Sequence, residues 1–211
     1  MLKNYLLPED LGEEFYNLKQ SVADGIPSAV FGVNLAEKCH LVTTLDLPVL
    51  YIVRDGLYGM KVSEELSAFS GEKVVYLPAK DDVLLYKTAF DRGSLFSRLN
   101  ALYEIKKGAK YVVSTFEALL QLFPKDVPTL QIKKYEVYDL NELAENLVAF
   151  GYRREEFAED KATFAIRGDI LEINPVNGID CYRVDFFGDE AESIFRYENG
   201  DKENKTLVSE C

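Results

Sequence analysis

Hydrophobic and polar positions follow different patterns in the two halves of the chain. Between Pro27 and about Phe123, short apolar runs alternate with segments of helical periodicity. The apolar runs predict buried strands at 28–33, 48–54, 73–79 and 110–115. The helical segments predict helices at 63–71 and 94–108, which end at Gly71 and Gly108. Strands that alternate with helices at short spacing predict a mainly parallel sheet.

The second half has one helical segment and then strand after strand. An amphipathic helix is predicted within 139–152, with Asp139 as its N-cap and Gly151 as its C-cap glycine. Alternating runs at 163–167, 170–173, 181–187 and 192–198 follow, separated by the turn pairs Gly168-Asp169, Asn177-Gly178 and Gly188-Asp189. This pattern predicts a small antiparallel sheet carrying one helix. The polar tail at 199–211 is expected to fray.

Charge is spread unevenly over these two halves. Residues 1–127 carry 14 basic and 17 acidic side chains, a net −3, whereas residues 128–211 carry 10 and 19, a net −9. Such an acidic surface repels phosphate backbones, so direct binding of duplex DNA or RNA is disfavoured. We expect a partner protein instead.

Composition and termini fit a soluble cytoplasmic protein. The chain has 211 residues, of which 47% are hydrophobic, enough for a substantial core. We expect no signal peptide and no membrane span, because no apolar run approaches ~18 residues. The three cysteines, Cys39, Cys181 and Cys211, lie far apart and are expected to be small core residues rather than metal ligands or a disulfide framework.

One segment can be aligned with a nucleotide-binding P-loop, G-x-x-x-x-G-K-[S/T]. Gly32 takes the first glycine position, Glu37 the second, Lys38 the lysine and Cys39 the hydroxyl. Glu37 sets a carboxylate against the phosphates, and a thiol is a poor magnesium ligand. We therefore expect no functional nucleotide site, no cofactor and no metal, and the partial match is either a relic or an accident. The fold class expected is α/β, with a degenerate P-loop-type parallel sheet domain at 1–127 and a small α+β domain with an antiparallel sheet at 128–211.

No other motif predicts catalysis, so we expect that the chain is not an enzyme. His40 is the only histidine, and no nucleophile motif such as G-x-S-x-G occurs.

The segment TFAIRGDILEINP, residues 163–175, places an arginine at the end of a strand. Alternation predicts that Phe164 and Ile166 face the core, whereas Arg167 lies on the solvent side beside the small Ala165. On the strand at 181–187 the same rule turns Arg183, Asp185 and Phe187 outward. Exposed arginines are common anchors of protein interfaces. The alternative is a surface ion pair of Arg167 with Asp185 or Glu172. Asp169 and Glu172 are expected to be a turn residue and a solvated residue.

These motifs resemble domain 2 shared by UvrB and the transcription-repair coupling factor family, Mfd. The resemblance rests on TFAIRGDILEINP, on YRVDFFGDEAESIFRYE at 182–198 and on the upstream Gly151-Tyr152-Arg153-Arg154. In the first half, the L-P, L-x-Y, R-L-x-A-L and V-V-x-T-x-x-A-L-L-Q elements resemble the coupling factors rather than UvrB. That family has a degenerate, non-binding copy of the P-loop, which favours the relic.

The resemblance implies a UvrA-docking surface in residues 128–211. Carried over by position, its residues are Arg154, Arg167 and Asp185, and we add the outward-facing Arg183. Ala165 occupies the place of a further arginine of UvrB, and Lys87 stands where the family has an acid, so these two positions depart from the pattern.

The function expected is a non-catalytic adaptor. It would recruit UvrA to stalled RNA polymerase in nucleotide excision repair, and it would contact other domains of the same full-length protein in autoinhibition. RNA polymerase and DNA would be bound only by regions outside this sequence. The alternatives are a nucleotide-binding or ATPase domain with an atypical P-loop, and direct DNA binding.

Overall fold

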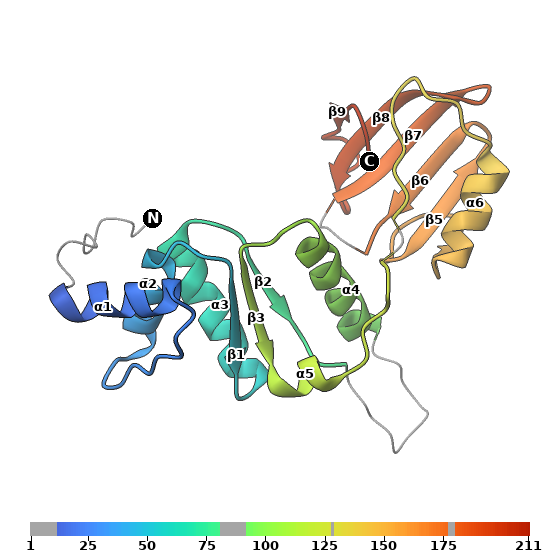
Figure 1. Cartoon of the computed structure of the whole chain (residues 1–211). Coiled ribbons are helices and arrows are strands. Elements are labelled where there is room, and N and C mark those ends of the chain that lie inside the picture. Colours follow the sequence, from blue (N-terminus) through green and yellow to red (C-terminus); the bar gives the residue numbers. More distant parts are fainter. Residues whose placement is uncertain (1–11, 81–91, 128, 177–179) are drawn as a thin grey trace, which may run out of the picture. The chain divides into compact units, whose positions relative to one another are not determined.

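The computed structural model describes residues 12–80, 92–127, 129–176 and 180–211. Lys87 and the predicted Asn177-Gly178 turn lie outside these residues. The chain divides into two compact units, Met1–Phe123 and Pro124–Cys211 (Figure 1). Each unit has its own sheet and its own core, and each is described by itself below.

The first unit is built on a three-stranded parallel sheet. Its strands are β1 (Val49–Val53), β2 (Val74–Leu77) and β3 (Tyr111–Thr115), in the order β1-β3-β2. All five residues of the central strand β3 are buried. The predicted strands at 48–54, 73–79 and 110–115 and the parallel sheet are thus confirmed.

Helices pack against both faces of this sheet. The helices α2 (Leu35–Thr44) and α3 (Gly56–Ser70) enclose a core of Cys39, Val53, Val62, Leu66 and Val113. On the other face α4 (Arg92–Lys106) packs Ala101 against Val75, Leu77 and Val112. Gly71 ends α3 in the left-handed conformation, as predicted. Two more helices, α1 (Gly12–Ala23) and the short α5 (Phe116–Leu120), were not predicted.

The strand predicted at 28–33 is wrong. These residues form no strand, and Phe31 is 87% exposed. An apolar run becomes a strand only when it pairs with a neighbour, and among the described residues this sheet ends at β1.

The second unit contains a six-stranded sheet in the order β4-β5-β6-β7-β8-β9. The strands are β4 (Arg153–Arg154), β5 (Thr163–Arg167), β6 (Ile170–Asn174), β7 (Asp180–Phe187), β8 (Glu190–Glu198) and β9 (Thr206–Val208). All neighbours are antiparallel except β4 and β5. The antiparallel sheet is confirmed, and Gly168 and Gly188 form its predicted turns with φ +59° and +60°.

One face of this sheet, the α6 face, holds the core of the unit. The helix α6 (Leu140–Ala149) begins at the predicted N-cap Asp139, whose side chain accepts hydrogen bonds from the backbone N–H groups of Asn141 and Glu142. Its buried Leu143 and Leu147 belong to the same core as the following residues of the sheet: Phe164, Leu171, Ile173, Val184 and Ile194. The opposite face, which we call the loop face, carries the alternate residues of the same strands.

The prediction that the tail frays is also wrong. Residues 206–208 form β9, which pairs with β8 through Ile194–Val208, Phe195–Leu207 and Arg196–Thr206. Beyond it, Cys211 and Ile132 exchange two backbone hydrogen bonds of 2.9 Å. The tail is therefore part of the sheet. No helix in the described residues is long and apolar enough to cross a membrane.

Candidate protein-docking surface

The predicted docking residues of β5 and β7, which are Arg167, Arg183 and Asp185, meet on the loop face. The β5–β6 hairpin turns at Gly168, and a turn of two residues with positive φ at its first position favours glycine. The resulting register aligns Ala165 with Glu172 and Glu172 with Arg183 in one row across three strands. Arg167, Ile170 and Asp185 form the next row.

Glu172 is the centre of this surface and is buried. Its side chain is 4% exposed, and its Oε2 lies 2.8 Å from the Nη2 of Arg167 and 3.3 Å from the Nζ of Lys202. The expectation that Glu172 is solvated is therefore wrong. A buried carboxylate is costly unless it is paired and hydrogen-bonded, so these two cations stabilise its charged form.

Arg183 and Asp185 form a second ion pair on the same face. The Nε of Arg183 donates to Oδ1 of Asp185 at 2.7 Å, and this hydrogen bond raises the pKa of Arg183. Both side chains turn away from the α6 face, as alternation predicted. Asp185 pairs with Arg183 here, whereas Arg167 pairs with Glu172.

Phe157 packs against the two cations that contact Glu172. The Cζ of Arg167 lies 4.9 Å from the centre of the Phe157 ring, and the Nζ of Lys202 lies 5.9 Å from it. Phe157 is 45% exposed. We call Arg167, Glu172, Arg183, Asp185 and Lys202 the charged cluster, with Phe157 at its edge.

Two loops fold over the remainder of the loop face. Asn174 Nδ2 and Asn199 Nδ2 donate to the carbonyl oxygen of Glu159 at 2.8 and 3.0 Å, which ties the loop at 155–162 to the sheet and to the loop after β8. Beside them Tyr197 is 3% exposed, and burial raises its pKa to about 12. Ala165 is 1% exposed, so the expectation that it borders open solvent is wrong.

Arg154 is not part of the charged cluster. It lies on the edge strand β4, is exposed and pairs in register with Phe164, whose side chain is in the core. The preceding Arg153 pairs with Thr163 and forms ion pairs with Glu155 and Asp160 at 3.2 and 3.6 Å. Register therefore places Arg154 toward the α6 face, away from Arg167.

The segment resembling a P-loop caps a helix with its own side chains. Gly32 has φ +76°, and Asn34 is the N-cap of α2. The Oδ1 of Asn34 accepts from the N–H of Glu37 at 3.0 Å, and the Oε2 of Glu37 accepts from the N–H of Asn34 at 2.8 Å. In this capping box the carboxylate of Glu37 occupies the helix N-terminus, where a phosphate would lie.

Lys38 and Cys39 follow on the first turn of that helix. Lys38 is half-buried, and Cys39 is 0% exposed in the core formed with Val53 and Val62. Burial raises the pKa of the Cys39 thiol to about 11, so the group is a neutral core residue rather than a ligand. In the described residues no group of three His, Cys, Asp or Glu side chains is placed to hold a metal ion.

Lys202 and Phe157 were missed by sequence reasoning. Phe157 lies between acidic residues outside any periodic run, and Lys202 lies in a polar stretch of mixed charge. No pattern in the sequence marks either residue, because each reaches the charged cluster only through the folding of a loop over the sheet.

Comparisons with known proteins match part of the second unit to a protein family and most of the chain to parts of longer proteins. Residues 130–210 match the UvrB interaction domain family. A transcription-repair-coupling factor of Myxococcus xanthus is 27% identical over 205 residues, which are 89% of this chain and 17% of that protein. A transcription-repair-coupling factor of Bacillus subtilis strain 168 is 24% identical over 169 residues, 77% of this chain and 14% of that protein. UvrABC system protein B of Thermotoga neapolitana is 32% identical over 123 residues, 56% of this chain and 18% of that protein.

The chain thus spans less than a fifth of the length of each of these relatives. The matched family covers the second unit, including the charged cluster and α6. Residues 130–210 are thus similar to the UvrB interaction domain family, in a chain that is similar over most of its length to a part of transcription-repair-coupling factors.

Proposed function

We propose that this chain is a protein-docking module of a transcription-repair coupling factor and that its second unit binds UvrA. The observation that carries the proposal is the half-exposed Arg167, which is held over the buried Glu172 on the loop face. The UvrB interaction domain match and the two coupling factors support the identity of the module.

The charged cluster is suited to docking because its main cation is already ordered. The Arg167 side chain is 40% exposed, and one of its five N–H donors is used by Glu172. The remaining donors are available to a carboxylate of the partner. Fixing a flexible side chain on binding costs about 0.5–1.5 kcal/mol, and Glu172 and the Phe157 ring reduce this cost in advance.

In this role the second unit recruits UvrA to a stalled RNA polymerase in nucleotide excision repair, in the cytoplasm. RNA polymerase and DNA are bound by regions outside this sequence, and other domains of the full-length protein cover the same surface in autoinhibition. Asp185 and Arg183 contribute to the docking surface as a pre-formed pair, and Arg154 contacts the partner from the edge strand.

The first unit acts as a scaffold that has lost its nucleotide site. We propose that the segment from Gly32 to Cys39 is a degenerate P-loop. This is supported by the capping box, which places a carboxylate at the helix N-terminus, and by the burial of Cys39. The alternative, an ATP-binding domain, is tested by calorimetry of the full chain with ATP and magnesium. Binding that is lost in Lys38→Ala would contradict the proposal.

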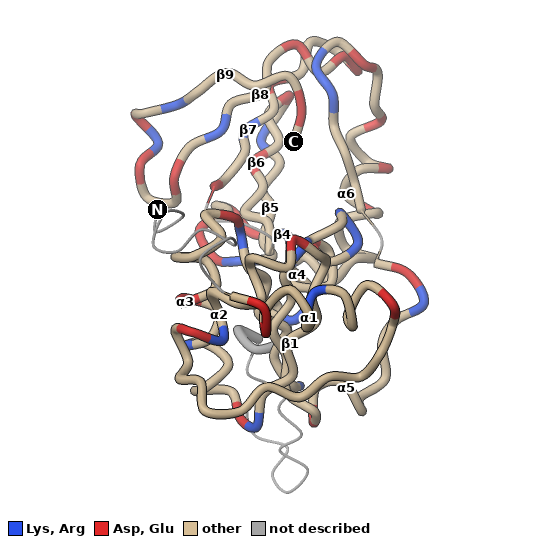
Figure 2. The backbone as a smooth tube through the Cα atoms, turned by 60° about the vertical axis from the view of Figure 1, so that its left-hand side comes forward, with Lys and Arg blue, Asp and Glu red and all other residues tan. Residues whose placement is uncertain are grey.

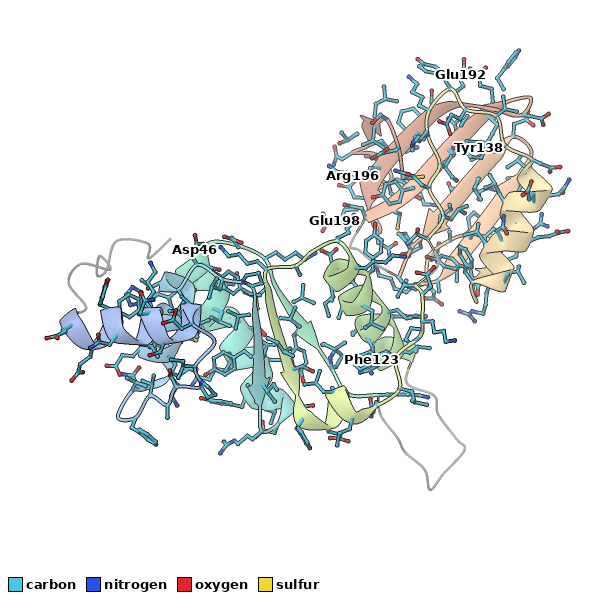
Figure 3. The ribbon with its side chains drawn as sticks, in the orientation of Figure 1. Asp46, Phe123, Tyr138, Glu192, Arg196 and Glu198 are labelled. Atoms are coloured by element: carbon cyan, nitrogen blue, oxygen red, sulfur yellow. The ribbon has the colours of Figure 1, made fainter. Side chains whose placement is uncertain are left out.

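The docking function is tested by titrating UvrA against the full chain and against Arg167→Ala. Truncating one partner of such a charge pair costs about 2–5 kcal/mol of binding free energy. The matched control is Arg196→Ala. Arg196 has a similarly exposed side chain (Figure 3) and lies on β8, but its register with Tyr182 places it on the α6 face. The proposal fails if both variants bind UvrA as tightly as the unmodified chain.

Arg154 needs a separate measurement, because it does not belong to the charged cluster. Arg154→Ala is expected to weaken binding less than Arg167→Ala does. Unchanged affinity in Arg154→Ala would remove this residue from the surface without affecting the assignment of the loop face.

A further inference from the structure

Lys202 reaches the charged cluster from outside the sheet. It lies in the loop between β8 and β9, yet its Nζ contacts Oε2 of Glu172 on β6. In the sheet, β7 separates β6 from β8, so the contact crosses over β7. Asn199 at the start of this loop donates to Glu159, and Asp201 accepts from both the backbone N–H and the side-chain amide of Asn204 at 3.2 and 2.7 Å. The loop is therefore shaped and attached so that Lys202 lies over the loop face.

One buried carboxylate is thus shared by two cations. Arg167 contacts Oε2 of Glu172 at 2.8 Å, and Lys202 contacts the same oxygen at 3.3 Å. The charged cluster holds three cations and two carboxylates. Arg183 and Asp185 neutralise one another, so Arg167 and Lys202 share the single negative charge of Glu172. The charged cluster therefore has one excess positive charge, in a region whose net charge is −9. The many Asp and Glu positions of this unit are drawn in red in Figure 2.

The excess charge is exposed together with an apolar ring. The Lys202 side chain is 42% exposed and has donors beyond the one that contacts Glu172. The Phe157 ring lies within cation–π distance of both Arg167 and Lys202. Glu172 already has an ion-pair partner in Arg167, at 2.8 Å. The positive charge of Lys202 is therefore not needed to neutralise Glu172, and it makes the surface more positive.

We propose that Lys202 is a second cationic contact of the docking surface. Together with Arg167 and Phe157 it forms a platform that binds an acidic segment of UvrA, with the carboxylates of that segment on the two cations and its apolar side chains on the Phe157 ring. This inference rests on the proposed docking of UvrA. It adds a residue and a partner chemistry to that function.

The test is the affinity of UvrA for the full chain and for Lys202→Ala, with Lys205→Ala as the matched control. Lys205 is an exposed lysine of the same loop. Lys202→Ala is expected to weaken binding about tenfold and to make the affinity less dependent on salt, because it removes one charge from the contact. Lys205→Ala and the conservative Lys202→Arg are expected to bind within about twofold of the unmodified chain.

A background variant separates contact with UvrA from support of Glu172. In Glu172→Gln the buried charge is gone, so Lys202 no longer neutralises it. If Lys202 contacts the partner, adding Lys202→Ala to Glu172→Gln still weakens binding. If Lys202→Ala has no effect in that background, its role is only to hold Glu172 and the inference is overturned.

The outcomes also distinguish this inference from the proposed function. Unchanged binding in Lys202→Ala with weakened binding in Arg167→Ala overturns the role of Lys202 and leaves the docking function standing. Unchanged binding in both variants overturns both.

Discussion

The Nη2 of Arg167 lies 2.8 Å from Oε2 of Glu172, and the arginine side chain is 40% exposed whereas the glutamate side chain is 4% exposed. The two residues thus differ in what their removal leaves behind. Without Glu172, Arg167 can turn to solvent. Without Arg167, the buried carboxylate keeps its ion pair with Lys202 as the remaining one among the described residues.

This asymmetry predicts a non-additive pair of substitutions. Arg167→Ala should lower the free energy of unfolding by about 1–2 kcal/mol, because it leaves the buried carboxylate of Glu172 poorly paired. The value is no larger because solvent screens the half-exposed arginine and weakens the ion pair. Glu172→Gln should cost less than Arg167→Ala. Adding Glu172→Gln to Arg167→Ala should restore part of the loss. Urea unfolding of the four chains measures this coupling, and strictly additive effects would show that the pair is not coupled.

The capping box of α2 predicts that the side chains of Asn34 and Glu37 stabilise the first unit. Asn34→Ala should destabilise the first unit by about 1 kcal/mol, because the N–H of Glu37 loses its acceptor. Glu37→Gln retains an acceptor for the N–H of Asn34 and should be nearly neutral, whereas Glu37→Ala should resemble Asn34→Ala. Thermal unfolding compares the three. Equal stability of Glu37→Ala and Glu37→Gln would argue against a structural role of this side chain.

Two glycines of α3 differ in the space around them. A Cβ at Gly59 would lie 2.6 Å from Cε2 of Tyr76 and 3.2 Å from Cγ2 of Val53. Gly59→Ala should therefore destabilise the first unit by about 1–3 kcal/mol in spite of the higher helix propensity of alanine. At Gly56 a Cβ would meet only the hydroxyl end of Tyr76, at 3.0 Å, so Gly56→Ala is the milder control. If Gly59→Ala is as stable as Gly56→Ala in urea, the close packing of Tyr76 on α3 is wrong.

The buried thiol of Cys39 should make the free energy of unfolding fall at alkaline pH. Burial raises its pKa from 9.0 to about 11, so between these pH values the unfolded chain loses the thiol proton while the folded chain keeps it. The free energy of unfolding should be unaffected by this group below pH 9 and should fall by about 1.4 kcal/mol per pH unit between pH 9 and about 11. Cys39→Ala, although less stable at neutral pH, should lack this part of the slope. Denaturation across pH 8 to 11 compares the two chains, and parallel curves would contradict the buried, neutral thiol.

Local chemistry was sufficient to predict most of the secondary structure and part of the site. Gly168 and Gly188 mark hairpin turns, and Asp139 marks the start of α6, because the conformation or hydrogen bond needed there suits few residues. Strict alternation also turned Arg183 and Asp185 away from the α6 face.

Features that depend on distant parts of the chain were not predictable in this way. The sequence named both Asp185 and Glu172 as possible partners of Arg167, and the structure has the pair with Glu172, because Asp185 pairs with Arg183 on the more distant β7. The tail at 206–208 is a strand because it pairs with the edge of β8, whereas the more apolar run at 28–33 pairs with no strand of the described residues, although β1 is an edge strand. Glu172 is buried because two loops and Lys202 close over a face that alternation alone assigns to solvent.

We propose above all that UvrA docks on the loop face of the second unit. Amide hydrogen exchange of the full chain with and without saturating UvrA tests it most directly, because exchange is followed on every element at once. We predict slower exchange on binding in the loops at 155–162 and 199–205, which carry Phe157 and Lys202, and no change in α6 on the opposite face. Slower exchange confined to α6 or to the first unit, with both loops unchanged, would contradict the account.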